Sequence, residues 1–325
     1  MSRNEVPSID VVCLGEFLLD FVPAESGHRL SESKFLRMAA GGAPANVAVA
    51  GRRLGLRTGF IGKTGSDPFG RYLREMLERS GVDTTCFTST GRAATRLAFV
   101  TNDPDESQRF LFYGSPPADS LLRRQDVPPS YLQRCRVLHV GSISMIQEPA
   151  RTATLAAVRR ARKIGILVSF DPNLRPALWP SLTRARREID RMLELCDILK
   201  VSQAEWEFLF GRNSYRKRLA ELQRRGVRLV AITSGDRGSL LASGGNLEQI
   251  KSLPVRAVDT TGAGDAYVAG LLYGVLRFAD GDPTVDGEGI RRIGRFASVV
   301  AGLSTTQLGA IPGFPSLAKV KRVLG

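Results

Sequence analysis

The stretch ARTATLAAVRRARKIGILVSF, residues 150–170, decides the fold class of this 325-residue chain. Residues 150–163 have the pattern of a helix, and residues 166–170 form a short β-rich run. Gly165 stands between them, where a residue in the left-handed conformation commonly ends a helix. A helix that leads directly into a strand is the repeating unit of an α/β fold.

The same alternation continues on both sides of this stretch. We expect central strands at residues 11–14, 58–61, 137–140, 166–170, 198–201 and 229–233. Helical patterns lie between them at residues 45–54, 69–80, 150–163, 183–195, 204–210 and 216–225. The sequence therefore predicts an α/β fold with a mainly parallel sheet that is covered by helices on both faces.

Two polar stretches, at about residues 23–38 and 87–113, interrupt this alternation. The second contains β-type runs at 96–100 and 109–113 with no helix between them. We expect both stretches to be inserted in the core and to pair into a small separate sheet. Since no repeat or long linker is present, we predict one domain over residues 1–325.

The composition is typical of a globular protein, with 43% hydrophobic and 24% charged residues. No apolar stretch approaches the roughly 20 residues that span a bilayer. The first residues lack the pattern of a signal peptide, so we expect a cytoplasmic protein without a membrane partner. Four separated cysteines, with no CxxC pair, predict neither a zinc site nor a disulfide framework: Cys13, Cys86, Cys135 and Cys196.

The net charge of +14 raises the question of nucleic-acid binding. The basic residues are mostly arginines, and they are spread through the helical segments instead of forming a tail. This distribution is typical of solvated helix faces. We therefore expect no nucleic-acid partner, and only a modest attraction for small anionic substrates.

Two apparent nucleotide-binding motifs do not fit their patterns. Gly62-Lys63-Thr64 resembles the end of a P-loop, but Arg57 stands where that motif needs its first glycine. Gly262-Ala263-Gly264 is followed by Tyr267 at the position of the third glycine of a Rossmann fingerprint. Both kinds of nucleotide site are therefore disfavoured.

The strongest local signal is Asp259-Thr260-Thr261-Gly262-Ala263-Gly264-Asp265, which precedes a helix rich in small residues. Free N–H groups and the positive dipole end make such a helix start an anion site, and the glycines let a phosphate approach the backbone. A carboxylate would repel a resting phosphate there. Asp265 therefore suggests a base that takes the proton of an attacking hydroxyl. The alternative is a capped helix start in which Asp265 only complements the dipole.

Further polar residues follow other predicted strands. Gly41 and Gly42 open a helix that carries Asn46, an amide suited to a polyol. Asp20 could accept hydrogen bonds from two sugar hydroxyls. Asn173 and Arg175 follow the strand at 166–170, and polar side chains at such strand ends line the crevice of an open α/β sheet.

With these motifs the chain resembles the ribokinase-like (PfkB) carbohydrate kinases, and among them the fructokinases. The resemblance covers nearly the whole chain and rests on Gly41-Gly42-Ala43-Pro44-Ala45-Asn46, on Gly65-x-Asp67-x-x-Gly70 and on 259–265. Further similar segments are Asp171-Pro172-Asn173-Leu174-Arg175 and Lys200-Val201-Ser202. The resemblance implies a three-layer α/β/α core with a small β-sheet lid, and often a homodimer formed through that lid.

The resemblance also implies roles for individual residues. Asp265 would be the catalytic base, and the amides of Gly262, Ala263 and Gly264 would form an anion hole. The sugar would be bound by Asp20, Gly41, Gly42, Asn46, Asn173 and Arg175. ATP would be bound by Thr233, Gly235, Gly238, Ser298 and Gly302, with Ser202 and Glu205 helping to organise Mg²⁺ and the phosphates. A monovalent cation, K⁺, would be surrounded by Asp259, Thr261, Ser304, Gln307 and Gly309.

The implied activity is ATP-dependent phosphorylation of fructose to fructose 6-phosphate. Ser202 replaces the asparagine that is commoner in the family, as it does in plant-like fructokinases. Gly114 stands where many fructokinases have an arginine, which leaves 2-keto-3-deoxygluconate and ribose as alternative acceptors. A catalytically silent binding protein is the alternative of a different class, but it would not need the complete motif at 262–265.

Overall fold

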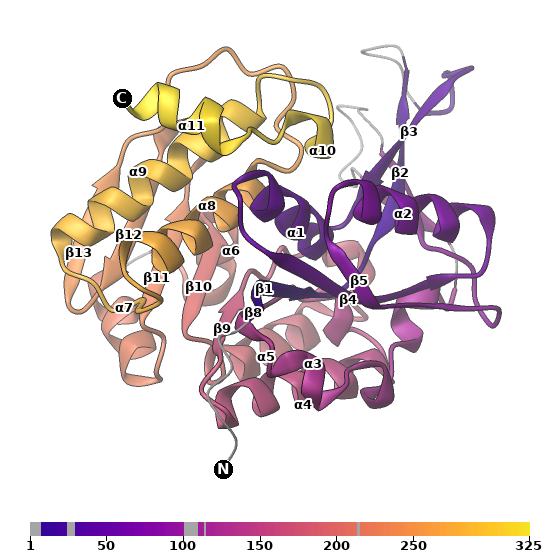
Figure 1. Cartoon of the computed structure of the whole chain (residues 1–325), viewed down its shortest axis with the longest axis horizontal. Helices are drawn as coiled ribbons and strands as arrows, with labels where there is room; N and C mark the ends of the chain where they lie inside the picture. The colour runs from indigo at the N-terminus through magenta and orange to yellow at the C-terminus, as the bar shows by residue number, and fades with distance from the viewer. Residues whose placement is uncertain (1–7, 25–29, 101–109, 114, 213–214) are drawn as a thin grey trace.

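The computed structural model describes residues 8–24, 30–100, 110–113, 115–212 and 215–325. Over these ranges the chain forms a large central sheet between two layers of helices, and a small sheet that projects away from it (Figure 1). The α/β architecture predicted from the sequence is confirmed.

The large sheet contains nine strands within the described residues, in the order β13-β12-β11-β10-β9-β8-β1-β4-β5. All neighbours pair in parallel except β11 with β12 and β12 with β13. The strands are β1 (Ile9–Leu14), β4 (Thr58–Gly65), β5 (Asp83–Thr90), β8 (Cys135–Val140), β9 (Leu167–Phe170), β10 (Ile198–Ser202), β11 (Leu229–Thr233), β12 (Ser239–Ser243) and β13 (Asn246–Ile250).

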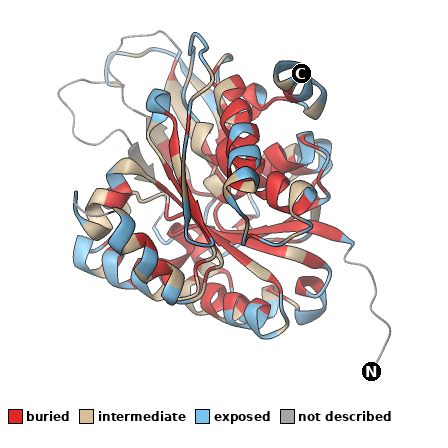
Figure 2. Ribbon diagram, turned by 90° about the vertical axis from the view of Figure 1, so that its left-hand side faces the viewer, coloured by how far each residue is buried: buried red, intermediate tan, exposed pale blue. Residues whose placement is uncertain are grey.

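Each face of this sheet carries its own apolar core. One core packs under α1 (Ala43–Arg53), α2 (Pro68–Arg79), α8 (Ala263–Phe278), α9 (Gly287–Ser304), α10 (Ala310–Gly313) and α11 (Leu317–Leu324). The other packs under α3 (Pro129–Leu132), α4 (Ala150–Lys163), α5 (Leu182–Leu193), α6 (Gln203–Phe210) and α7 (Tyr215–Arg224). Figure 2 shows the buried residues on the strands and on the inner helix faces. None of the helices described here is long and apolar enough to cross a membrane.

Helix α8 is buried along most of its length, with α9 and α1 both packed against it. A Cβ atom on Gly270 would lie 2.7 Å from the Cα atom of Ala297, and one on Gly274 would lie 2.9 Å from Cγ2 of Ile293. These glycines therefore let the two helices approach closely. This packing holds the first turn of α8 in place above the sheet.

The small sheet has four strands within the described residues, in the order β3-β2-β6-β7. They are β2 (Leu18–Pro23), β3 (Leu36–Gly41), β6 (Leu97–Val100) and β7 (Phe110–Tyr113). Phe21 stacks on Phe99 with ring centroids 5.1 Å apart, and the edge of Tyr113 meets Phe99 at 5.2 Å. Phe21 also meets Phe69 of α2 at 6.1 Å, so aromatic contacts join the strands of this sheet to each other and to α2.

The two excursions expected at 23–38 and 87–113 overlap the small sheet but have different bounds. Residues 87–90 complete β5 in the large sheet, because Cys86 and Phe87 point alternately into the two apolar cores. The small sheet also uses β2, which ends where the first excursion was expected to begin. Residues 25–29 and 101–109 of these excursions, and Gly114, lie outside the described residues.

Candidate active site

Asp265 lies in the first turn of α8, at the edge of the sheet where β9, β10 and β11 end. The helix begins after Gly262, which adopts a left-handed conformation with φ 78°. A Cβ atom there would lie 2.6 Å from the Cβ atom of Ala310, so both the conformation and the contact favour glycine. The N–H of Ala263 donates to the carbonyl oxygen of Thr260 at 3.2 Å.

Two amide side chains from distant parts of the chain hold the Asp265 carboxylate. Nδ2 of Asn46 in α1 donates to Oδ2 at 2.8 Å, and Nδ2 of Asn173 donates to Oδ1 at 3.4 Å. Oδ1 of Asn46 is buried and has no hydrogen-bond partner among the described residues. An unpaired buried acceptor is costly, so this atom suits a ligand that brings a hydroxyl donor.

Burial raises the pKa of Asp265 to about 7, although the hydrogen bond from Asn46 and the positive charge of Arg175 oppose this shift. Burial likewise raises the pKa of Asp20 to about 7, and Arg175 again opposes it. Arg175 therefore influences both carboxylates electrostatically. A carboxyl group that titrates near neutral pH can act as a base in the physiological range.

Backbone geometry places Asp20 beside the start of α1. A Cβ atom on Gly41 would overlap the carboxylate of Asp20, and one on Gly42, with φ 119°, would lie 2.6 Å from the carbonyl oxygen of Glu16. Oε1 of Glu16 accepts the N–H of Ala43 at 3.1 Å. The role of Glu16 in holding this helix start was missed at the sequence level, because a lone acidic residue after a strand has no local signature.

Ser202 and Glu205 form a capping box at the start of α6. Oε2 of Glu205 accepts both the N–H and the hydroxyl of Ser202 at 2.7 Å, while Oε1 accepts the N–H of Leu174 at 2.7 Å. Glu205 thus ties the end of β10 to the loop that carries Asn173 and Arg175.

A cavity of about 250 Å³ lies on the other side of the α8 start. It brings together seven of the residues expected around a nucleotide or phosphate: Thr233, Gly235, Gly238, Ala263, Gly264, Ser298 and Gly302. Its apolar wall was not predicted and consists mainly of Leu253, Val255, Ala257 and Tyr267. An apolar slot next to a helix N-terminus suits a planar base joined to phosphates.

The residues expected around a monovalent cation lie on the loop before α8 and the loop after α9. Oδ1 of Asp259 accepts the N–H of Thr261 at 2.9 Å, and Oδ2 accepts the N–H of Gly309 at 2.8 Å. The carbonyl oxygens of Ser304 and Gln307 both lie near Gly313. Among the described residues, no group of three or more His, Cys, Asp or Glu side chains could hold a metal ion.

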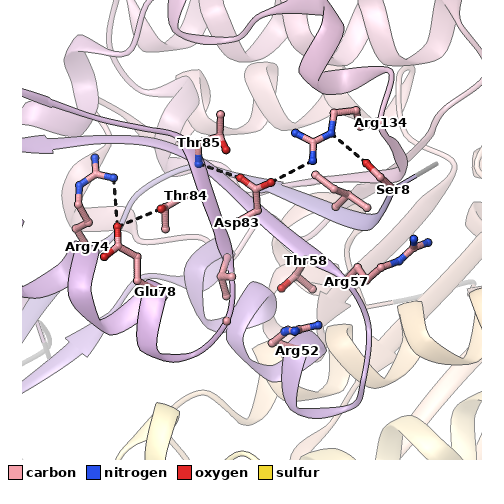
Figure 3. A pocket seen from close by; sticks show the side chains of 13 residues that line it. Ser8, Arg52, Arg57, Thr58, Arg74, Glu78, Asp83, Thr84, Thr85 and Arg134 are labelled. Atoms are coloured by element: carbon pink, nitrogen blue, oxygen red, sulfur yellow. Dashed lines mark hydrogen bonds and ion pairs between the residues drawn. The ribbon is translucent and has the colours of Figure 1, made fainter. Parts of the chain in front are cut away.

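A larger cavity, of about 730 Å³, lies at the opposite edge of the sheet, where β1, β4 and β5 begin (Figure 3). Its acidic groups are paired with arginines: Asp83 with Arg134 at 3.3 Å and Glu78 with Arg74 at 3.8 Å. Since none of the expected site residues lines this cavity, we place the candidate active site at Asp265.

Comparisons with known proteins identify the family of this chain. Residues 8–317 match the model of the pfkB family carbohydrate kinases. The chain is 42% identical to fructokinase-1 of Zea mays over 97% of both chains. It is 33% identical to the fructokinase of Vibrio cholerae O395, crystallised with fructose, ADP and calcium, with a TM-score of 0.86 over 98% of this chain and all of the other.

A third relative is the aminoimidazole riboside kinase of Salmonella enterica, crystallised with aminoimidazole riboside and an ATP analogue. It is 30% identical, with a TM-score of 0.83 over 97% of this chain and 100% of that chain. The matched family model covers far more than half of the chain, including every residue of the candidate active site. The chain therefore belongs to the pfkB family of carbohydrate kinases.

Proposed function

We propose that this kinase transfers the γ-phosphoryl group of Mg-ATP to the primary hydroxyl of fructose. The products are fructose 6-phosphate and ADP. Asp265 takes the proton of the attacking hydroxyl, the new bond forms between that oxygen and the γ-phosphorus, and the bond from this phosphorus to the bridging oxygen of ADP breaks. The backbone at Gly262, Ala263 and Gly264 stabilises the negative charge of the transferred group.

The observation that carries this proposal is the convergence of three elements on one buried carboxylate. Asp265 lies at the start of α8, is held by Asn46 from α1 and Asn173 from the loop after β9, and has a pKa of about 7. A mere helix cap would not need two amide partners from other elements. The fructokinase relatives support fructose as the acceptor.

The sugar is proposed to lie between the small sheet and α8. Asp20 and the free Oδ1 of Asn46 would accept hydrogen bonds from its hydroxyl groups, while Asn173 and Arg175 would donate hydrogen bonds to its oxygens. Gly41 and Gly42 leave the space that these contacts require. The nucleotide is proposed to occupy the cavity lined by Thr233, Gly235, Gly238, Ser298 and Gly302.

Two cations complete the proposal. Mg²⁺ would neutralise the phosphate charge, and Ser202 with Glu205 would position it indirectly, since both oxygens of Glu205 already accept hydrogen bonds. K⁺ would lie at the loops around Asp259, Thr261, Ser304, Gln307 and Gly309, because the carbonyl oxygens of Ser304 and Gln307 both lie near Gly313 and the carboxylate of Asp259 ties the two loops together.

The direct test is a panel of acceptors supplied to the purified protein with ATP, Mg²⁺ and K⁺. When the release of ADP is measured, fructose should give a higher kcat/KM than ribose and 2-keto-3-deoxygluconate. The similarity to aminoimidazole riboside kinase makes ribosides the second candidate class. A higher kcat/KM with any of these acceptors would reject fructose while leaving the kinase chemistry intact.

We also propose that two copies of the chain associate through their small sheets. Large apolar side chains are exposed there, with 72% of Phe35 and 58% of Tyr113 accessible. Leu36 and Met38 on β3 are exposed as well. A second copy would cover these side chains.

A further inference from the structure

One buried charge near Asp265 has no role in the mechanism described so far. Lys200 is the only charged residue of β10, where Ile198, Leu199 and Val201 are fully buried. Strand alternation places Ile198 and Lys200 on the face covered by α8, and only 7% of Lys200 is exposed. A lysine at such a core position is rarely buried unless it is paired.

The partner of Lys200 is Asp171, which follows β9. Nζ of Lys200 lies 2.9 Å from Oδ2 of Asp171, and only 2% of Asp171 is exposed. Oδ1 of Asp171 accepts the N–H of Asn173 at 3.1 Å. Apolar residues in place of a buried ion pair are often equally stable, so stability alone does not account for this pair.

The position of the ammonium group suggests its purpose. A Cβ atom on Gly264 would lie 3.0 Å from Nζ of Lys200, so the ammonium sits beside the first turn of α8. A cation at the positive end of a helix is unfavourable unless anions surround it. Lys200 also lines a cavity of about 370 Å³ with Asn173, Arg175 and Glu205, while Gly264 lines the nucleotide cavity. It therefore stands between the two halves of the active site.

We propose that Lys200, fixed by Asp171, is a positioning residue for the transfer step: its ammonium group keeps Asp265 ionised as the base, and Asp171 limits this effect. The inference rests on the proposed role of Asp265. The pair thus determines the lower limit of the pH range in which the enzyme works.

The charges around Asp265 give the sign of each effect. Besides burial and the neutral Asn46, the groups that act on Asp265 are Asp171, which raises its pKa, and Lys200 and Arg175, which lower it. Cys13 also faces Asp265, but burial raises the pKa of that thiol well above its usual range and keeps it neutral. Two further groups face Lys200, namely Glu205 and the buried His139. Burial lowers the pKa of His139 to about 3, so this side chain carries no charge at neutral pH.

The test compares two single variants through the pH dependence of kcat/KM. Lys200→Met removes the positive charge, so the acid limb should move to higher pH by about one unit, and activity should recover in alkaline buffer. Asp171→Asn removes the negative charge but keeps an oxygen for the N–H of Asn173, so the limb should move to lower pH. Shifts in the same direction, or an unmoved limb with lower kcat, would show a purely structural role and overturn the inference.

Two further variants cover a folding failure of Lys200→Met. In the background of Asp171→Asn, adding Lys200→Met leaves no unpaired buried charge from this pair and should move the limb back to higher pH. The matched control is Lys63→Met, which breaks the 2.7 Å ion pair of Lys63 with Asp126. Neither of these residues lines a cavity of the proposed site, so the limb should stay in place. If the acid limb of the double variant coincides with that of the Asp171→Asn single variant, the role of Lys200 is also rejected.

A second readout separates this inference from the proposed function. The titration of Asp265 can be followed by NMR of protein labelled with ¹³C at the aspartate carboxyls, with Asp265→Asn for assignment. If the enzyme transfers nothing to any sugar of the panel, the proposed function fails, yet opposite shifts of this titration in the two single variants would still support the role of the pair. If the titration of Asp265 does not shift in opposite directions in the two single variants, the role of the pair is rejected even when the enzyme is active.

Discussion

At the scale of single residues, the burial of Asp265 links the stability of the fold to the proposed role of this residue as the base. Its pKa rises from 3.8 to about 7 on folding, chiefly through burial. The folded protein therefore favours the protonated carboxyl: this contribution to stability is complete below pH 3.8 and is lost as the pH rises through about 7. At pH 8 the negative charge that the proposed base requires makes the folded state less stable.

Asp265→Asn should separate these two effects. Since asparagine cannot take a proton from the acceptor, kcat should fall by about 10²–10⁴-fold, measured by release of ADP. Because asparagine is uncharged, the free energy of unfolding at pH 8 should rise by about 1–3 kcal/mol, and the gain should vanish towards pH 4. A variant with the stability of the original chain at pH 8 would contradict the raised pKa, and an unchanged kcat would remove Asp265 from the mechanism.

At the scale of elements, the start of α6 depends on the capping box of Ser202 and Glu205. Ser202→Ala should cost about 1 kcal/mol of stability and should also lower kcat, because Glu205 loses a partner and its hold on Leu174 weakens. Ser316→Ala is the matched control, since Ser316 caps α11 away from the site and should lose similar stability without a change in kcat. Equal activities of the two variants would argue against a functional role of the box.

The contact between α8 and α9 provides a second element-scale prediction. Gly270→Ala would place a Cβ atom 2.7 Å from the backbone of Ala297, which cannot move without displacing α9. We expect a loss of about 1–3 kcal/mol in urea unfolding. Gly91→Ala, where the new Cβ atom meets nothing within 4 Å, should change stability by less than about 0.5 kcal/mol. Similar results for both variants would refute close packing at Gly270.

At the scale of the whole molecule, the exposed apolar face of the small sheet predicts association. Sedimentation velocity should show a dimer for the original protein and a monomer for Phe35→Asp, because a charge buried in the interface would destabilise the dimer. Val323→Asp, on α11 and 42% exposed, should leave the assembly unchanged. A single chain for the original protein at micromolar concentration would exclude this interface.

Much of the fold follows from local patterns. The six central strands predicted from the sequence all occur, because each buried run between two helical segments has the β-type composition that a covered sheet requires. By contrast, β12 and β13 were not predicted, since they follow each other without an intervening helix and so depart from the strand–helix alternation. The place of residues 87–90 in β5 depended on which core their side chains could reach, which local composition does not specify.

The sequence by itself determined that Asp265 stands in the first turn of a helix that follows glycines, because glycines before a helix start and an acid within its first turn are local features. Only the tertiary structure decided which side chains contact Asp265. Asn46 lies 219 positions away in the chain, and Asn173 lies 92 positions away. The same holds for Lys200 in β10 and Asp171 directly after β9, because only the pairing of these two strands brings their side chains together. Burial and the distances between charges exist only in the folded chain, and they determine whether a carboxylate is a cap or a base.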